Sequence, residues 1–295
     1  MIGRVTQQTM QRSTLANLQL NLSKMSSIQQ EMSSGKRISK PSDDPSGTSL
    51  ALSMRSEQRS YTQFARNIDD GLGWLSAADA SMQSAVTQLR RARDLTVQGG
   101  SGSLNAAGRE ALATEIESVR DGLISEANTS FQGRNVFAGT SNSAVAFDSS
   151  AGYAWNGTAA GTVERRISPD ATVRADADGS AVFGNGSTSV FALLDSIAAD
   201  IRAGVDIGSR LTEIDTRMDT MLGELSGVGS RMNRLTTAQG TISQKLQDLQ
   251  INLSGVEDVD LTSAIVELQS QEVAYKGALG ATARVLQPTL MDYLR

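Results

Sequence analysis

The strongest constraint on the fold is a seven-residue repeat of apolar side chains in residues 211–256. Alternating steps of three and four residues along this stretch meet an apolar residue at every position except Gln239. The positions are Leu211, Ile214, Met218, Met221, Leu225, Val228, Met232, Leu235, Gln239, Ile242, Leu246, Leu249, Leu253 and Val256. Such a repeat keeps one stripe facing a partner helix, which is typical of a coiled coil. We therefore predict a helix about 70 Å long that packs lengthwise on another, with Gln239 as a polar residue that fixes the register.

Composition excludes several classes of function. The 295 residues include no His and no Cys, which removes the usual general base, the thiol nucleophile, the commonest zinc ligands and any disulfide. Aromatic residues make up only 4% of the chain, which is little for the thick core of a compact enzyme but enough for a helical rod. We therefore expect a structural protein without a cofactor or a metal, and an enzyme is the weakest alternative.

Charge and hydropathy argue against nucleic-acid and membrane partners. The net charge of −5 is mild and has the wrong sign for a nucleic-acid-binding protein. No apolar run is long enough to span a membrane, which argues against a membrane-anchored coiled-coil sensor. Residues 1–11 are polar and lack the apolar core of a cleavable signal peptide. We therefore expect either a cytoplasmic protein or one that is exported without cleavage.

The two ends of the chain carry opposite charge and similar apolar stripes. Residues 1–40 hold six Lys or Arg and one acid, whereas residues 256–295 hold six acids and three bases. We expect these ends to pair with each other and to become ordered once neighbouring subunits cover them, although two unrelated solvated helix faces are the alternative. The residues predicted to mediate subunit assembly are Leu15, Leu18, Leu22, Met25, Met32, Leu261, Ile265, Leu268, Tyr275, Leu279 and Leu286.

Capping and turn signals set the limits of the other helices. The first helix should end near Gly35, and a final helix should begin after the cap residue Asp260. Between Lys40 and Gly47 a cluster of Pro, Ser and Asp predicts a turn, in which the carboxylates make turn hydrogen bonds and have no catalytic role. The remaining helices are predicted over residues 48–97, 106–130 and from 189 to about 204.

Residues 131–188 differ from the helical parts in composition. Four of the six Phe and Trp155 fall here among many Gly, Ser and Thr. The short runs 162–167, 172–174 and 181–183 are predicted strands. The predicted fold class is therefore mainly α, an elongated antiparallel helical bundle or coiled-coil rod with an inserted small β-rich subdomain.

We predict three parts for the chain. Terminal helices at 1–40 and 258–295 pair as an inner coiled coil, and residues 41–130 with 189–257 form the helical rod domain. The β-rich insert forms an outer subdomain over residues 131–188.

Several local strings resemble motifs of the flagellin family. They are Ser33-Ser34-Gly35-Lys36-Arg37-Ile38 followed by Asp43-Asp44, then Asn67-Ile68-Asp69-Asp70-Gly71, the run from Leu89 to Gln98, and the end of the chain from Val285 to Arg295. The resemblance covers roughly residues 1–140 and 190–295 in the same order. Within the family, the strings at 41–45 and 131–139 resemble the flagellin-like hook-associated proteins, which join the flagellar hook to the filament.

The resemblance implies a structural component of the bacterial flagellum. Such a subunit lies outside the cell, assembles at the hook tip, receives flagellin, and leaves through the type III export apparatus without a cleaved signal peptide. Its implied partners are further copies of itself in a ring or helical lattice, a second hook-associated protein, flagellin and an export chaperone. The alternative within the family is a short flagellin that polymerises into the filament itself.

Two further sites follow from the resemblance alone. An export chaperone would bind the C-terminal segment, with Leu279, Leu286, Leu290 and Leu294 as candidate contacts. In flagellins a region like residues 89–98 meets an innate immune receptor, and the matching candidates are Arg91, Leu95 and Glu115.

Overall fold

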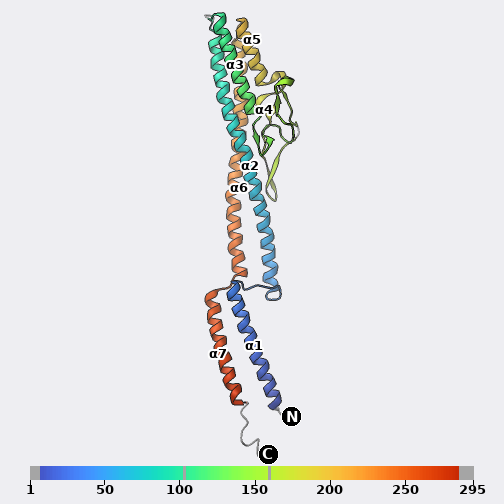
Figure 1. Cartoon of the computed structure of the whole chain (residues 1–295), viewed down its shortest axis with the longest axis vertical. Coiled ribbons are helices and arrows are strands. Elements are labelled where there is room, and N and C mark those ends of the chain that lie inside the picture. The colour runs from blue at the N-terminus through green and yellow to red at the C-terminus, as the bar shows by residue number, and fades with distance from the viewer. Residues whose placement is uncertain (1–6, 102–103, 159–160, 286–295) are drawn as a thin grey trace, which may run out of the picture. The chain divides into compact units, whose positions relative to one another are not determined.

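The computed structural model describes residues 7–101, 104–158 and 161–285 (Figure 1). It divides into two compact units. We call them the terminal unit, which comprises Met1–Arg59 and Leu246–Arg295, and the central unit, which comprises Ser60–Lys245.

Helices dominate the described part of the chain. They are α1 (Gln7–Ser34), α2 (Pro45–Gly99), α3 (Ala106–Ala127), α4 (Gly179–Phe183), α5 (Val190–Ala203), α6 (Gly208–Glu257) and α7 (Leu261–Val285). Short strands form three antiparallel pairs, β1 (Ser130–Phe131) with β2 (Arg134–Asn135), β3 (Phe147–Asp148) with β4 (Ala154–Trp155), and β5 (Glu164–Ser168) with β6 (Ala171–Arg174). The first turns of α2 and the last turns of α6 belong to the terminal unit.

The predicted helix limits are confirmed where a cap or a glycine sets them. After α1 the backbone enters the left-handed region at Gly35, with φ of 69°, which glycine adopts without a steric penalty. The side chain of Ser189 accepts a hydrogen bond from the backbone N–H of Ala192 and so caps α5. Asp260 caps α7 in the same way, because its carboxylate accepts from the backbone N–H of Thr262.

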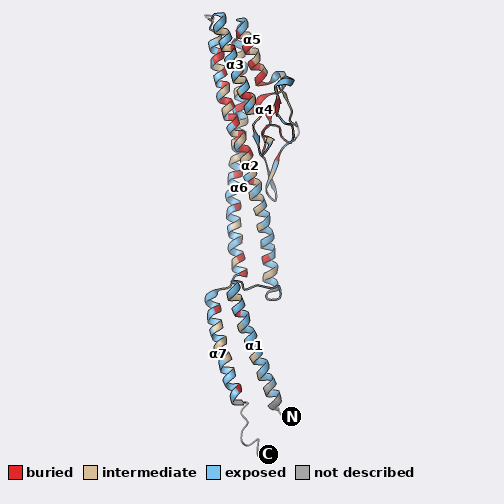
Figure 2. Ribbon diagram, viewed as in Figure 1, coloured by how far each residue is buried: buried red, intermediate tan, exposed pale blue. Residues whose placement is uncertain are grey.

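Helices α2, α3, α5 and α6 pack around a shared core in the central unit (Figure 2). Arg93 pairs with Asp215, and further along the same helices Asp69 pairs with Gln239, so α2 and α6 are antiparallel. Helix α3 lies beside α5. The core includes the fully buried side chains of Leu75, Met82, Leu89, Ile116, Leu123, Leu194 and Ile197.

In the part of α6 that belongs to the central unit, burial follows the predicted seven-residue repeat, but only one of its two rows is fully covered. That row consists of Ile214, Met221, Val228, Leu235 and Ile242. In the other row, residues such as Met218, Leu225 and Met232 are half-buried. Gln239 belongs to this second row, is exposed, and donates a hydrogen bond of 2.8 Å to Oδ1 of Asp69. It therefore lies at the edge of the helix pair, outside the covered row.

The insert is held by a cluster of aromatic rings. The rings of Phe137, Phe147 and Phe183 meet edge to face, and Phe191 of α5 joins them at 5.3 Å from Phe147. Because these rings are buried together, they attach the insert to the bundle of the central unit.

One predicted strand of the insert is wrong. Residues 181–183 are part of the helix α4, whose first turn is capped by the Asp178 carboxylate through the N–H groups of Ser180 and Ala181. A run of three apolar residues did not reveal this cap. The prediction of a mainly α chain with long antiparallel helices and a small β-rich insert is otherwise confirmed.

Candidate assembly surface

Helices α1 and α7 pack against each other in the terminal unit through a narrow seam (Figure 1). The least exposed positions on both helices recur in alternating steps of four and three residues, as in a coiled coil. On α1 they are Thr14, Leu18, Asn21, Met25, Ile28 and Met32. On α7 they are Ala264, Leu268, Gln271, Tyr275, Ala278 and Thr282. Half of these side chains are small or polar, so the seam alone covers little apolar surface.

The large apolar side chains of the terminal unit mostly point away from this seam. Of the fifteen large hydrophobic residues that are exposed in the described part of the chain, eleven belong to the terminal unit. They are Leu15, Leu20, Leu22, Leu50, Leu52, Ile251, Leu261, Ile265, Val266, Val273 and Leu279, and Val273 reaches 70% exposure. So many large apolar side chains exposed within one unit are typical of a surface that another protein covers. We call these eleven residues the apolar face.

The predicted assembly residues divide between the seam and the apolar face. Leu18, Met25, Met32, Leu268 and Tyr275 lie in the seam. Leu15, Leu22, Leu261, Ile265 and Leu279 belong to the apolar face. Leu286, together with the chaperone candidates Leu290 and Leu294, lies outside the described residues.

Both sets also contain residues outside the predicted assembly list. Ile28 and Ala264 are buried in the seam, while Val266 and Val273 belong to the apolar face. A search for a single stripe of large apolar residues could not separate the two sets, because the seam on α7 uses small side chains. The spacing of Ala264, Gln271 and Ala278 at seven residues was the available signal.

Four charged residues join the segment after α1 to the end of α6. Nζ of Lys36 lies 2.6 Å from Oδ1 of Asp258 and 3.4 Å from Oε2 of Glu257. Arg55 of α2 approaches the same Glu257 oxygen at 2.7 Å. We call Lys36, Arg55, Glu257 and Asp258 the ionic clasp. Because the Glu257 side chain is only 8% exposed, the contacts with Lys36 and Arg55 offset the cost of burying it.

Backbone hydrogen bonds reinforce the ionic clasp. The N–H of Arg37 donates to the carbonyl of Glu257 at 2.7 Å, and the N–H of Val259 donates to the carbonyl of Gly35 at 3.1 Å. The two connections, from α1 to α2 and from α6 to α7, are therefore paired like two short antiparallel strands.

The charges of the clasp shift one another's pKa values. The hydrogen bond from Lys36, followed by that from Ser254, lowers the pKa of Asp258 below its ordinary 3.8. The same contact with Asp258 raises the pKa of Lys36 above its ordinary 10.5. Both groups are therefore charged at neutral pH, when their attraction is present.

The turn before α2 confirms the role predicted for the two neighbouring carboxylates. Asp43 accepts from the backbone N–H groups of Ser39 and Lys40. Asp44 accepts from the N–H of Gly47, and this hydrogen bond is the main cause that lowers the pKa of Asp44. Both carboxylates therefore stabilise a turn and a helix start.

Residues 67–71 of α2 contact two other elements of the central unit, the β5–β6 hairpin and helix α6. The side-chain amide of Asn67 donates to the carbonyl of Arg166 at 2.9 Å, and Asp70 pairs with Arg165 at 2.6 Å. Both contacts fix the β5–β6 hairpin. Gly71 leaves room for Leu235 of α6, whose side chain lies 3.1 Å from the position a Cβ atom would take. The motif therefore positions the hairpin and α6.

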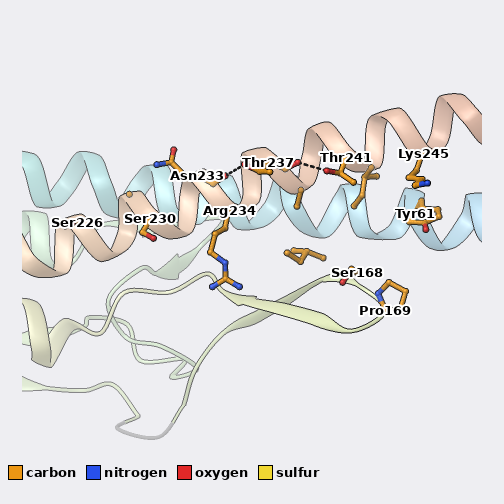
Figure 3. A pocket seen from close by; sticks show the side chains of 14 residues that line it. Tyr61, Ser168, Pro169, Ser226, Ser230, Asn233, Arg234, Thr237, Thr241 and Lys245 are labelled. Atoms are coloured by element: carbon orange, nitrogen blue, oxygen red, sulfur yellow. Dashed lines mark hydrogen bonds between the residues drawn. The ribbon is translucent and has the colours of Figure 1, made fainter.

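A groove of about 980 Å³ lies on the central unit between α6 and the turn of the β5–β6 hairpin (Figure 3). Small residues of α6 form its floor: Ser226, Gly229, Ser230, Thr237, Ala238 and Thr241. Ser168 and Pro169 of the hairpin turn stand opposite, and Arg234 and Lys245 of α6 add positive charge.

The three candidates for receptor contact do not share one exposed surface. Arg91 and Glu115 are exposed and pair with each other at 3.3 Å. Leu95 is only 2% exposed and belongs to the core of the bundle. Of the three, Arg91 and Glu115 alone are accessible to a partner in this structure.

The described ranges contain no cluster of three or more side chains placed to hold a metal ion. Within the same residues, no helix has the length and hydropathy that crossing a membrane requires.

Comparison with known proteins places the chain among flagellar proteins. Residues 5–142 match the family model of the bacterial flagellin N-terminal helical region. Flagellar hook-associated protein 3 of Salmonella typhimurium is 24% identical over 301 residues, which span 93% of this chain and 94% of that protein. Flagellin FlaB2 of Treponema pallidum is 25% identical over 272 residues, 91% of this chain and 91% of its own.

A solved structure shows the same likeness to a flagellar hook-associated protein. The flagellar hook-associated protein of Vibrio parahaemolyticus superposes with a TM-score of 0.66 at 25% identity, over 73% of this chain and 100% of that structure. Residues 5–142 therefore match the flagellin N-terminal helical region, and the chain resembles flagellar hook-associated proteins over most of its length.

Proposed function

We propose that this chain is a structural subunit of the bacterial flagellum that forms the junction between hook and filament. The observation that carries the proposal is the end-to-end likeness to hook-associated protein 3, which leaves only a small part of either sequence unmatched. The chain would be a building block rather than an enzyme.

The apolar face supplies the physical basis for assembly. Burying one Val, Leu or Ile side chain stabilises an interface by about 1.5 to 3 kcal/mol. Eleven such residues in the terminal unit can therefore hold copies together without a covalent link or a nucleotide. We propose that the terminal helices at 1–40 and 258–295 form the inner layer of the assembly, with the rod domain and the insert of residues 131–188 outside it.

The other proposed partners follow from the same role. A junction subunit contacts a second hook-associated protein on one side and flagellin on the other. Before assembly, an export chaperone would cover Leu279, Leu286, Leu290 and Leu294, because exposed apolar residues would otherwise cause premature association. The location is the flagellum outside the cell, after type III export without a cleaved signal peptide.

A short filament flagellin is the second candidate function. Its support is the likeness to flagellin FlaB2 of Treponema pallidum over 91% of both chains. A flagellin would polymerise into the whole filament, whereas a junction protein forms a limited layer.

Deletion of the gene in the source bacterium separates the two functions. For a junction protein we expect bare hooks, with flagellin released as monomer into the medium. For a flagellin we expect missing filaments and no such flagellin in the medium. Normal filaments in the deletion strain would contradict both proposals.

A point variant links the phenotype to the apolar face. Val273→Asp places a charge at the most exposed of these residues and should abolish filament attachment. Val145→Asp is the matched control, because Val145 is an exposed valine of the insert. We expect the control to keep filaments, and equal behaviour of the two variants would count against assembly through the terminal unit.

A further inference from the structure

The floor of the groove beside the β5–β6 hairpin is suited to a helix. From Ser226 to Lys245 it extends roughly 29 Å along α6, at 1.5 Å per residue. Its side chains are mostly hydroxyls, glycine and alanine, so a second helix could approach the α6 backbone closely. Close approach increases van der Waals contact, and small residues at a helix interface permit axis separations near 8 Å.

A second surface of small residues lies on helix α3, on the side exposed to solvent. One line of exposed positions recurs in alternating steps of four and three residues: Ala107, Ala111, Thr114, Ser118, Asp121 and Ser125, with the exposed Glu110 and Glu115 beside it. None of the side chains in this line is large. Helix α3 has 22 residues and is therefore roughly 33 Å long, which matches the length of the groove floor.

The two surfaces also have complementary charge. Arg234 and Lys245 contribute positive charge to the groove and make no ion pair within the described part of the chain. Glu115 and Asp121 on α3 pair with arginines of their own chain, but their side chains remain 49% and 67% exposed. They can therefore attract a second set of cations on a neighbouring molecule.

We propose that the groove receives helix α3 of a second copy of this chain. The inference rests on the proposed role as an assembly subunit, and it adds a contact between central units to the contacts made by the apolar face. The contact joins two different surfaces of one chain, so each copy offers a free α3 and a free groove to the next. Contacts of this kind generate rings or helical assemblies.

Disulfide trapping tests the contact directly, because the chain has no cysteine of its own. Ser118→Cys places a thiol at the middle of the α3 surface, and Asn233→Cys places one in the groove. The two full-length variants are mixed at high concentration under mild oxidation. The same pair is also produced together in cells, from which flagella are isolated. We expect a disulfide-linked dimer of the two variants in both preparations.

Two comparisons make the result specific. Ser243→Cys is the matched control for Asn233→Cys, because it is exposed on α6 but does not line the groove. The dimer with Asn233→Cys should form several-fold faster than the dimer with Ser243→Cys. Arg234→Glu together with Lys245→Glu should abolish this difference, and reversing Glu115 and Asp121 to Lys in the α3 partner should restore it.

Other outcomes overturn the inference. Equal rates for the groove variant and its control would show that α3 does not enter the groove. Faster trapping of Asn233→Cys by a flagellin that carries a cysteine at the position matching Ser118 would assign the groove to a different protein. The junction role is judged separately by filaments and released flagellin in the deletion strain, so the two conclusions can fail independently.

Discussion

Lys36 and Asp258 are separated by 222 positions in the sequence, yet their side chains are joined by a hydrogen bond of 2.6 Å. This pair ties the segment after α1 to the segment before α7, and backbone hydrogen bonds run beside it. The pairing of the chain ends in the terminal unit therefore begins at a polar junction and continues along the seam between α1 and α7.

Loss of the ionic clasp should loosen the terminal unit by a small amount. Lys36 is 43% exposed and Arg55 is 50% exposed, so solvent screening keeps the contribution of each pair small. We expect Lys36→Met to raise the hydrogen-exchange rates of the N–H groups of Arg37 and Val259. Lys24→Met is the control, because Lys24 is an exposed residue of α1 without an ion pair in the described part of the chain. The same exchange rates in both variants would contradict a stabilising role.

The clasp should weaken at both ends of the pH scale. Because the folded state lowers the pKa of Asp258 below 3.8, its contribution is present above that pH and is lost as the pH falls through the folded pKa. Because the pKa of Lys36 is raised above 10.5, its contribution is present below that pH and is lost at higher pH. The difference in Val259 exchange between the natural chain and Asp258→Asn should therefore be constant near neutrality and shrink in acid. A difference that stays constant through the whole acid titration would rule out this linkage.

Tyr153 should make the attachment of the insert sensitive to alkali. Its hydroxyl donates to Asp195 of α5 at 2.5 Å, and burial together with this contact raises the pKa of Tyr153 to about 12 from 10.0. The stabilisation is fully present below pH 10 and is lost as the pH rises through about 12, because the hydroxyl must lose the proton that it donates. Tyr153→Phe should therefore flatten the fall in thermal stability in this range.

The control for this measurement is Tyr61→Phe. The hydroxyl of Tyr61 makes no hydrogen bond in the described part of the chain, and its ring meets Phe64. Its removal should leave the alkaline fall in stability in place. An unchanged alkaline profile for Tyr153→Phe would show that the hydrogen bond to Asp195 does not stabilise the fold.

Substitutions in the two rows of the α6 repeat should differ sharply in how much they lower the free energy of unfolding. Leu235 is fully buried, so Leu235→Ala should lower the free energy of unfolding by about 2 to 5 kcal/mol. Leu225 belongs to the second row and is half-buried, so Leu225→Ala should cost less in the same urea titration. Similar costs for the two variants would mean that the bundle of the central unit is not packed as described.

Gln239→Leu tests the polar position in the second row. Since Gln239 is exposed and its partner Asp69 is also accessible to water, we expect a change of no more than about 0.5 kcal/mol. A large gain in stability would instead indicate that this position is buried against another helix in solution.

Much of the fold could be predicted because local signals set it. Gly35, Ser189 and Asp260 set helix ends through caps and turn conformations that involve only neighbouring residues. The repeat in residues 211–256 predicted α6 because a helix brings every third and fourth residue to one side. Local patterns failed for Ala181 to Phe183, where the cap at Asp178 outweighed the apolar run.

The assembly surface could be predicted only in part. The sequence by itself determined that both chain ends form apolar helices of opposite charge, because periodicity and charge are properties of each helix alone. Only the tertiary structure decided which residues of those helices face each other, since Ala264 and Thr282 enter the seam while the larger Val273 remains exposed. The groove beside the hairpin and the ionic clasp likewise depend on residues brought together from distant parts of the chain. Their positions follow from how the helices pack, which the spacing along any one helix does not specify.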